Sequence, residues 1–200
     1  EPRLIAFSFG EEEVVGYSQR FAGSPADFFS LLAEAAARLK TEHPGRLIAS
    51  VVEPSAIGGF ASGASDAQQP NVEFWSIQAA GRASVAALFD EVRGRTAKPY
   101  LIAGFGVDAY DQRASAADLT AQAQAAETLA REIDSALRGG FHRLLGALWS
   151  SYADEWARGG PNPRLHGAGG VAAAGSPDGW WNPGWSGLFG VAVSGAPGLD

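Results

Sequence analysis

The chain has 200 residues, of which 46% are hydrophobic and 18% are charged, and this composition predicts a folded domain with a sizeable core rather than a disordered chain. Its net charge of −7 argues against nucleic acid or an anionic membrane as a partner, because no basic surplus neutralises phosphates. The lack of cysteine excludes disulfides, thiolate metal sites and cysteine nucleophiles, and it is compatible with any compartment.

The first quarter of the chain has a strand–helix–strand pattern. It starts at Glu1 without Met, as expected of a processed or excised piece of a longer chain. Residues 3–10, RLIAFSFG, form a continuous apolar run that predicts a buried strand. Residues 24–40 predict a helix, because Ser24 is a suitable N-cap and a proline follows it. Residues 46–52, RLIASVV, predict the second strand.

The same alternation continues to residue 150. Residues 72–78 predict a third strand and residues 84–94 a short helix that ends in glycine. Residues 99–106, PYLIAGFG, predict the fourth strand. Residues 115–140 then predict a long helix, with Ser115 as N-cap and two glycines as the stop signal. Residues 144–150 predict the fifth strand.

This pattern predicts an α/β fold. Strands that are apolar on both faces and alternate with helices favour a parallel sheet with outer helices and right-handed crossovers. A (β/α) barrel segment and an open doubly wound sheet both fit. We expect one domain over residues 1–158. Residues 159–200 are rich in Gly, Pro and Trp, which predicts a surface loop followed by a tail that docks on the same domain.

Polar and aromatic side chains gather where the predicted strands end. In parallel α/β folds the carboxyl ends of the strands carry the functional site. Aromatic rings together with carboxylates and amides suit carbohydrate, because rings stack on its CH faces and polar oxygens bond to its hydroxyls. The residues expected to bind carbohydrate are Trp75, Gln78, Asp108, Tyr110, Trp149, Asp154 and Glu155.

Each of these features also has a simpler structural explanation. Trp75 and Trp149 lie within apolar strands and suit the core equally well, and Asp154 with Glu155 can cap a following helix. The three histidines lack the spacing of metal ligands. The glycine clusters lack the strand–loop–helix context of a nucleotide site. We therefore expect neither a metal nor a cofactor.

The order of the strand ends resembles the second half of the catalytic barrel in retaining glycoside hydrolases of the large (β/α)₈ clan. The likeness is closest to the family 2 type β-glycosidases. That family has Gly-Asn-Glu at its fourth strand, with Glu as the acid/base, and Glu12 stands at this position here. Its seventh strand carries the nucleophile within Pro-x-x-x-x-Glu-x-Gly-x-Asp-Ala-Tyr. The matching stretch, PYLIAGFGVDAYD, has Gly104 in place of that Glu.

The resemblance implies that catalysis has been lost. Retaining glycosidases need two carboxyl groups, and a glycine cannot form a glycosyl ester. Further departures accompany Gly104: the family pattern has Asn, Tyr and Glu where this chain has Gln78, Ala80 and Gly184. The favoured interpretation is a non-enzymatic glycosidase-like module that binds carbohydrate or serves in a polysaccharide-handling assembly.

Two alternatives stay open. One is an active retaining β-glycosidase fragment with Glu12 as acid/base and another nucleophile. The other is a purely structural interaction domain. In either case the five predicted strands correspond to strands four to eight of an eight-stranded barrel. We therefore expect either a partial barrel that an upstream segment, a partner chain or homo-oligomerisation completes, or a sheet that stays open with helices on both faces.

Overall fold

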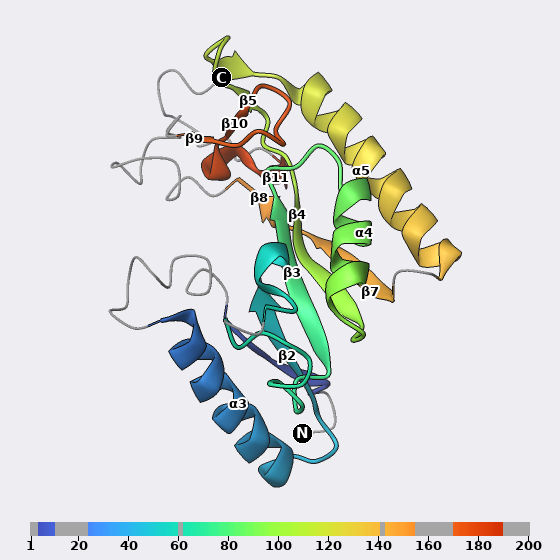
Figure 1. The fold of residues 1–200 in the computed structure, drawn as a ribbon. Coiled ribbons are helices and arrows are strands. Elements are labelled where there is room, and N and C mark those ends of the chain that lie inside the picture. Colours follow the sequence, from blue (N-terminus) through green and yellow to red (C-terminus); the bar gives the residue numbers. More distant parts are fainter. Residues whose placement is uncertain (1–3, 11–23, 60–61, 141–142, 155–169, 190–200) are drawn as a thin grey trace. The chain divides into compact units, whose positions relative to one another are not determined.

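A parallel five-stranded sheet organises the computed structural model, which describes residues 4–10, 24–59, 62–140, 143–154 and 170–189 (Figure 1). The strands are ordered β1-β2-β3-β4-β7. The pairing is parallel where Ala6 of β1 lies opposite Leu47 of β2 and where Ala49 of β2 lies opposite Phe74 of β3. The strand bounds are β1 Ala6–Phe9, β2 Leu47–Val52, β3 Phe74–Ala80, β4 Tyr100–Gly106 and β7 Leu144–Trp149.

Three helices connect these strands within the described residues, and they confirm the α/β class. They are α3 Pro25–Glu42, α4 Ala86–Arg95 and α5 Leu119–Gly139. They follow β1, β3 and β4, whereas the described part of the connection from β2 to β3 holds a 3₁₀ turn, η1 Pro54–Ala56. None of the described helices combines the length and the apolar character needed to cross a bilayer.

Helix starts follow their capping residues. Ser24 accepts a bond at Oγ from the Asp27 amide, and Asp27 Oδ2 accepts one from the Ser24 amide at 2.8 Å, which closes a capping box as α3 begins. The predicted start of the long helix at Ser115 is wrong. Ser115 has a φ of 54°, and Asp118 Oδ1 instead accepts a bond from the Ala121 amide at 2.9 Å.

The described chain also contains short two-stranded sheets, which the sequence did not predict. They pair β5 Tyr110–Asp111 with β6 Ala116–Ala117, β8 Ser151–Ala153 with β11 Gly187–Phe189, and β9 Val171–Ala172 with β10 Trp180–Trp181. A second 3₁₀ turn, η3 Pro183–Trp185, precedes β11. The expected domain boundary at residue 158 lies outside the described residues.

The chain forms two compact units, each with its own core. The first comprises Glu1–Gln78, Ala86–Ala103 and Ile133–Ala147, and the second comprises Ala79–Val85, Gly104–Glu132 and Leu148–Asp200. Buried side chains of the first unit include Leu32, Ile48, Val52, Trp75, Leu88, Tyr100 and Ile102. Those of the second include Val85, Val107, Ala109, Leu129 and Asn182.

The partly buried carboxylate of Asp66 links separate segments of the first unit. Asp66 Oδ1 accepts bonds from Thr96 Oγ1 at 2.6 Å and from Trp75 Nε1 at 3.3 Å, while Oδ2 accepts one from the Ala97 amide at 2.7 Å. Burial works against ionisation, but these bonds outweigh it and lower the pKa of Asp66. The carboxylate thereby joins the β2–β3 connection to the start of β4.

We expect Asp66→Asn to lower the free energy of unfolding at pH 7 by about 1 kcal/mol, near the low end for charged hydrogen bonds because Asp66 is part-exposed. An amide has one acceptor oxygen, so its NH₂ group would face a donor. Because the folded pKa of Asp66 is lowered, its contribution is present above the unfolded pKa and is lost as pH falls through the folded pKa. Thermal melts at pH 7 and pH 3 measure this. A variant equally destabilised at both would contradict it.

The two edges of the described sheet lack the usual protection against pairing. β1 and β7 each have a neighbouring strand on one side only, and neither contains a charged residue or a proline. Exposed apolar side chains lie at both edges: Ile5 is 74% exposed and Leu145 is 55% exposed. Edges of this kind favour association with further strands.

We therefore expect the isolated 200-residue chain to self-associate through these edges. Its weight-average mass in sedimentation should rise with concentration over about a hundredfold range. The double variant Ile5→Lys, Leu145→Lys should shift toward monomer, because edge lysines oppose strand pairing. A wild-type chain that stays monomeric and melts cooperatively would show that its edges need no partner.

Candidate functional site

The carboxyl end of β4 leads into a buried carboxylate. Asp108 is 8% exposed, and its Oδ1 accepts bonds from the Tyr110 amide at 3.1 Å and from Asn182 Nδ2 at 3.3 Å. Burial raises the pKa of Asp108, although the hydrogen bonds from Asn182 and Tyr110 oppose that shift. Asp108 is therefore mostly buried, and its Oδ1 atom is already engaged in hydrogen bonds within the chain.

A short stretch of the C-terminal segment contacts most of the predicted site residues. We call residues 182–187 the tail turn. Trp149 Nε1 donates to the Ser186 carbonyl at 2.9 Å, and Asp154 Oδ1 accepts from the Gly187 amide at 3.0 Å. The ring of Tyr110 lies 5.1 Å from that of Trp185, between centroids. Together with Asp108, these residues contact the chain's own tail turn, whereas the sequence analysis expected them to bind carbohydrate.

Backbone contacts hold the tail turn in place. The Ala109 amide donates to the Trp185 carbonyl at 3.0 Å. The buried Gln122 side chain donates through Nε2 to the Gly187 carbonyl at 3.0 Å and to the Val107 carbonyl at 3.2 Å. A Cβ at Gly187 would lie 2.2 Å from the Asp154 amide nitrogen, so only glycine fits there.

Trp149 is packed as well as hydrogen-bonded. Gly106 has a φ of 133°, and a Cβ there would lie 2.8 Å from the indole ring. Phe105 meets the same indole edge-on, with centroids 5.3 Å apart and planes at 74°. Trp149 is half-buried in this arrangement, so it contributes to the packing of the unit.

The remaining predicted residues lie in different settings. Trp75 has 0% exposure and its Nε1 donates to Asp66 and Thr96, so it offers no face on which a sugar could stack. Its burial favours the core role that the sequence left open. Gln78 is half-buried on β3 and Gly104 is buried on β4. Glu12 and Glu155 lie outside the described residues.

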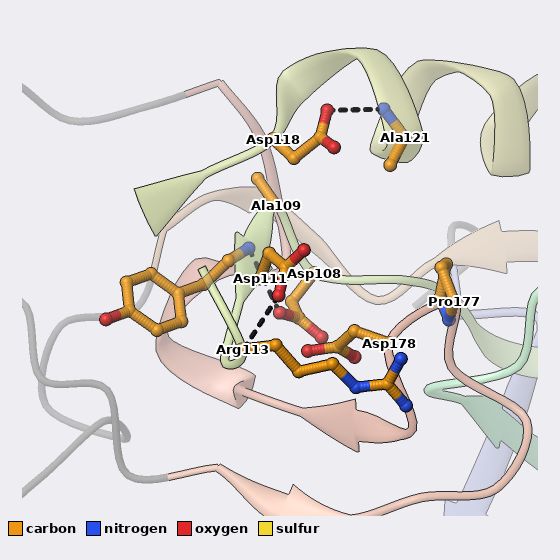
Figure 2. A pocket seen from close by; sticks show the side chains of 9 residues that line it. Asp108, Ala109, Asp111, Arg113, Asp118, Ala121, Pro177 and Asp178 are labelled. Atoms are coloured by element: carbon orange, nitrogen blue, oxygen red, sulfur yellow. Dashed lines mark hydrogen bonds between the residues drawn. The ribbon is translucent and has the colours of Figure 1, made fainter. Parts of the chain in front are cut away.

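A hollow of about 220 Å³ opens beside Asp108 in the second unit (Figure 2). Figure 2 shows the side chain of Arg113 extending past the carboxylates of Asp108 and Asp178. Among the described residues, no carboxylate lies within ion-pair distance of the Arg113 guanidinium. The hollow is lined by Asp108, Ala109, Tyr110, Asp111, Arg113, Asp118, Ala121, Pro177 and Asp178.

Two of the carboxylates around this hollow accept hydrogen bonds from backbone amides. Asp111 Oδ1 accepts from the Arg113 amide at 2.7 Å, and Asp178 accepts from the Gln112 amide at 2.8 Å and the Trp180 amide at 2.9 Å. These bonds shape turns and leave further lone pairs free for hydroxyl groups. No group of three or more His, Cys, Asp or Glu residues suited to a metal ion occurs in the described part of the chain.

The sequence analysis did not single out Arg113 or Asp178 as site residues. Both lie in turns. The Arg113 amide donates a hydrogen bond to Asp111 Oδ1, two residues earlier, and Asp178 precedes Gly179, which has a φ of 84°. The sequence signal for Asp178 is its Pro-Asp-Gly turn motif. That motif predicts a turn but not which distant segment it will meet.

Comparisons with known proteins bear on the fold. No protein-family model and no curated protein matches the chain. Among solved structures, it is similar to a Bacteroides uniformis β-glucuronidase, with a TM-score of 0.55 and 11% identity over 76% of this chain and 19% of that chain. It is also similar to Bacteroides uniformis β-glucuronidase 2 covalently bound to cyclophellitol-6-carboxylate aziridine, with a TM-score of 0.53, 11% identity and the same coverages.

A GH113 β-1,4-mannanase is also similar, with a TM-score of 0.43 and 13% identity over 60% of this chain and 39% of that chain. At such identities the likeness concerns the fold alone, which is TIM-barrel-like. The chain spans about a fifth of the length of the two β-glucuronidases. The five-stranded parallel sheet is consistent with part of such a barrel.

We expect Asp108→Asn to behave oppositely to Asp66→Asn. The amide keeps the oxygen that accepts from Tyr110 and Asn182 and removes a buried charge. At pH 7 the variant should match the wild type or exceed its free energy of unfolding by up to about 1 kcal/mol.

The pH dependence follows from the raised folded pKa of Asp108. Stability from the protonated carboxyl is present below the unfolded pKa and is lost as pH rises through the folded pKa. The advantage of the variant should therefore shrink from pH 7 to pH 3 in chemical denaturation. A variant that is strongly destabilised at pH 7 would show that the Asp108 charge itself stabilises the fold.

Proposed function

We propose that this chain is a degenerate domain of the family 2 β-glycosidase type that binds carbohydrate without hydrolysing it. The observation that carries the proposal is Gly104. It is buried on β4, at the position where the resembled family carries its nucleophile. A retaining mechanism needs a carboxylate there to form the glycosyl ester.

The first carboxylate that follows Gly104 in the sequence supports this proposal. Asp108 lies four residues further on, is buried, and accepts bonds from Tyr110 and Asn182. A nucleophile must instead reach the anomeric carbon with an ionised oxygen, and burial raises the pKa of Asp108. These properties suit an anchor for the tail turn better than a nucleophile.

The hollow beside Asp108 offers the chemistry of a small polyol site. Carboxylate oxygens accept bonds from sugar hydroxyls, the Arg113 guanidinium donates to sugar oxygens, and the half-buried ring of Tyr110 offers an apolar edge. We propose that a neutral or weakly charged glycan binds here. Assembly with a polysaccharide-handling partner extends the same proposal.

The catalytic test uses aryl β-glycosides. We expect no turnover above buffer for the β-glucoside, β-galactoside, β-mannoside and β-glucuronide, the last included because the similar structures are β-glucuronidases. Loss of a nucleophile costs several orders of magnitude in rate. Gly104→Glu should restore little, because Gln78 and Ala80 also depart from the family pattern.

Glu12→Gln serves as the matched variant for this assay. Turnover by the wild type that disappears in Glu12→Gln would overturn the proposal and establish the alternative, an active β-glycosidase with Glu12 as acid/base. Turnover that persists at the same rate in Glu12→Gln would point to a contaminating hydrolase.

A further inference from the structure

Two aromatic rings outside the hollow are exposed and in contact. Tyr152 on β8 is 77% exposed, and Phe189 at the end of β11 is 56% exposed. Their ring centroids lie 4.9 Å apart and their planes meet at 46°. Large exposed aromatic side chains that touch each other mark an interaction site more often than single exposed residues do. We call Tyr152 and Phe189 the ring pair.

The backbone beneath the ring pair is held on both sides. β8 and β11 are parallel, with Gly187 opposite Ser151 and Phe189 opposite Ala153. The Asp154 amide donates to the Phe189 carbonyl at 3.1 Å, and the Gly187 amide donates to Asp154 Oδ1 at 3.0 Å. These bonds hold the backbone of both residues in place, so less conformational entropy of the protein is lost when a ligand stacks on the rings.

The ring pair belongs to the same unit as the candidate site. β8 follows β7, whose last residue is Trp149, and β11 begins at Gly187, the last residue of the tail turn. A ligand on the ring pair would therefore lie on the elements that seat the tail turn. This continuity makes the ring pair an extension of the proposed carbohydrate-binding region.

We propose that the ring pair is a glycan-stacking site for β-linked oligosaccharide, an inference that rests on the proposed carbohydrate-binding function. Sugar CH faces stack on aromatic rings, and the Tyr152 hydroxyl adds a polar group at the rim. The patch holds two rings, each with roughly 150–250 Å² of surface. A stable protein interface needs about 800 Å² per partner, so the size fits one or two sugar rings.

The charge of the chain agrees with a neutral ligand. The net charge of −7 disfavours anionic glycans in general, and neither member of the ring pair carries charge. Stacking on rings is insensitive to the charge of the protein, whereas a sulfated or phosphorylated glycan would need a basic patch. The probes are therefore neutral: cellohexaose, laminarihexaose, mannohexaose and a β-galactan hexaose.

Calorimetric titration of the full 200-residue chain with each probe tests the inference. Tyr152→Ala and Phe189→Ala should each weaken binding by about tenfold or more, since 1.4 kcal/mol of stacking is a factor of ten. Tyr152→Phe keeps the ring and should stay within about threefold of the wild type. Leu119→Ala, which truncates an exposed apolar residue on α5, is the matched control and should leave affinity unchanged.

Two further measurements separate stacking from folding and from protein contact. The melting temperature of Tyr152→Ala should match the wild type within about 1 °C, because the side chain is mostly exposed. In saturation-transfer NMR, irradiation of aromatic protons should saturate the sugar CH protons, and the double variant Tyr152→Ala, Phe189→Ala should lose this transfer. If the wild type bound no sugar but self-associated in sedimentation, and the double variant did not self-associate, the ring pair would be a protein contact and the proposal would be overturned.

The remaining outcomes distinguish the two proposals. If a probe binds and both alanine variants keep wild-type affinity, the stacking site is refuted while the carbohydrate-binding function stands. If a probe binds and only Arg113→Ala weakens it, the hollow alone is the site. If none of the four probes binds the wild type, the carbohydrate-binding function fails and the stacking site fails with it.

Discussion

The second unit depends on a buried hydrogen bond between two distant residues. Asp108 follows β4, Asn182 opens the tail turn, and both are buried where they meet. A buried polar group without a partner destabilises a fold, so each of these residues requires the other. Their contact fixes the tail turn, which in turn positions the bond from Trp149 to Ser186 and the bond from Gly187 to Asp154. The frame of β8 and β11 follows from these contacts.

This arrangement changes what the polar groups at the strand ends can do. A carboxylate that serves as an acid or nucleophile must be open to substrate and carry a pKa matched to its task. Asp108, Asp111, Asp154 and Asp178 all accept backbone or side-chain bonds from their own chain. These carboxylates therefore stabilise the fold, and a ligand can bind only to the oxygen lone pairs that the internal hydrogen bonds leave free. Among the described residues, the hollow and the ring pair are the two surfaces that we propose for ligand binding.

The sheet carries a second constraint. A parallel sheet is stable when both faces and both edges are covered, and a closed barrel covers its edges by pairing them. Here the described sheet ends at β1 and β7, strands without charge or proline. The matched part of this chain covers only 19% of each similar β-glucuronidase. The described sheet is consistent with part of a TIM-barrel-like fold, and its two edges are of the kind that a closed barrel pairs.

The sequence by itself determined the α/β class, the five strands and the helix α3, because apolar runs and the Ser24 cap act over a few neighbouring residues. It also indicated that Asp108, Tyr110, Trp149 and Asp154 lie at or just after strand ends, where they were expected to bind carbohydrate. Tertiary structure alone decided what these residues bind. Only the fold brings residue 182 to residue 108, buries Trp75 beneath Asp66 and Thr96, and joins Tyr152 to Phe189. Such contacts depend on chain segments tens of residues apart, and no local pattern encodes which of them will meet.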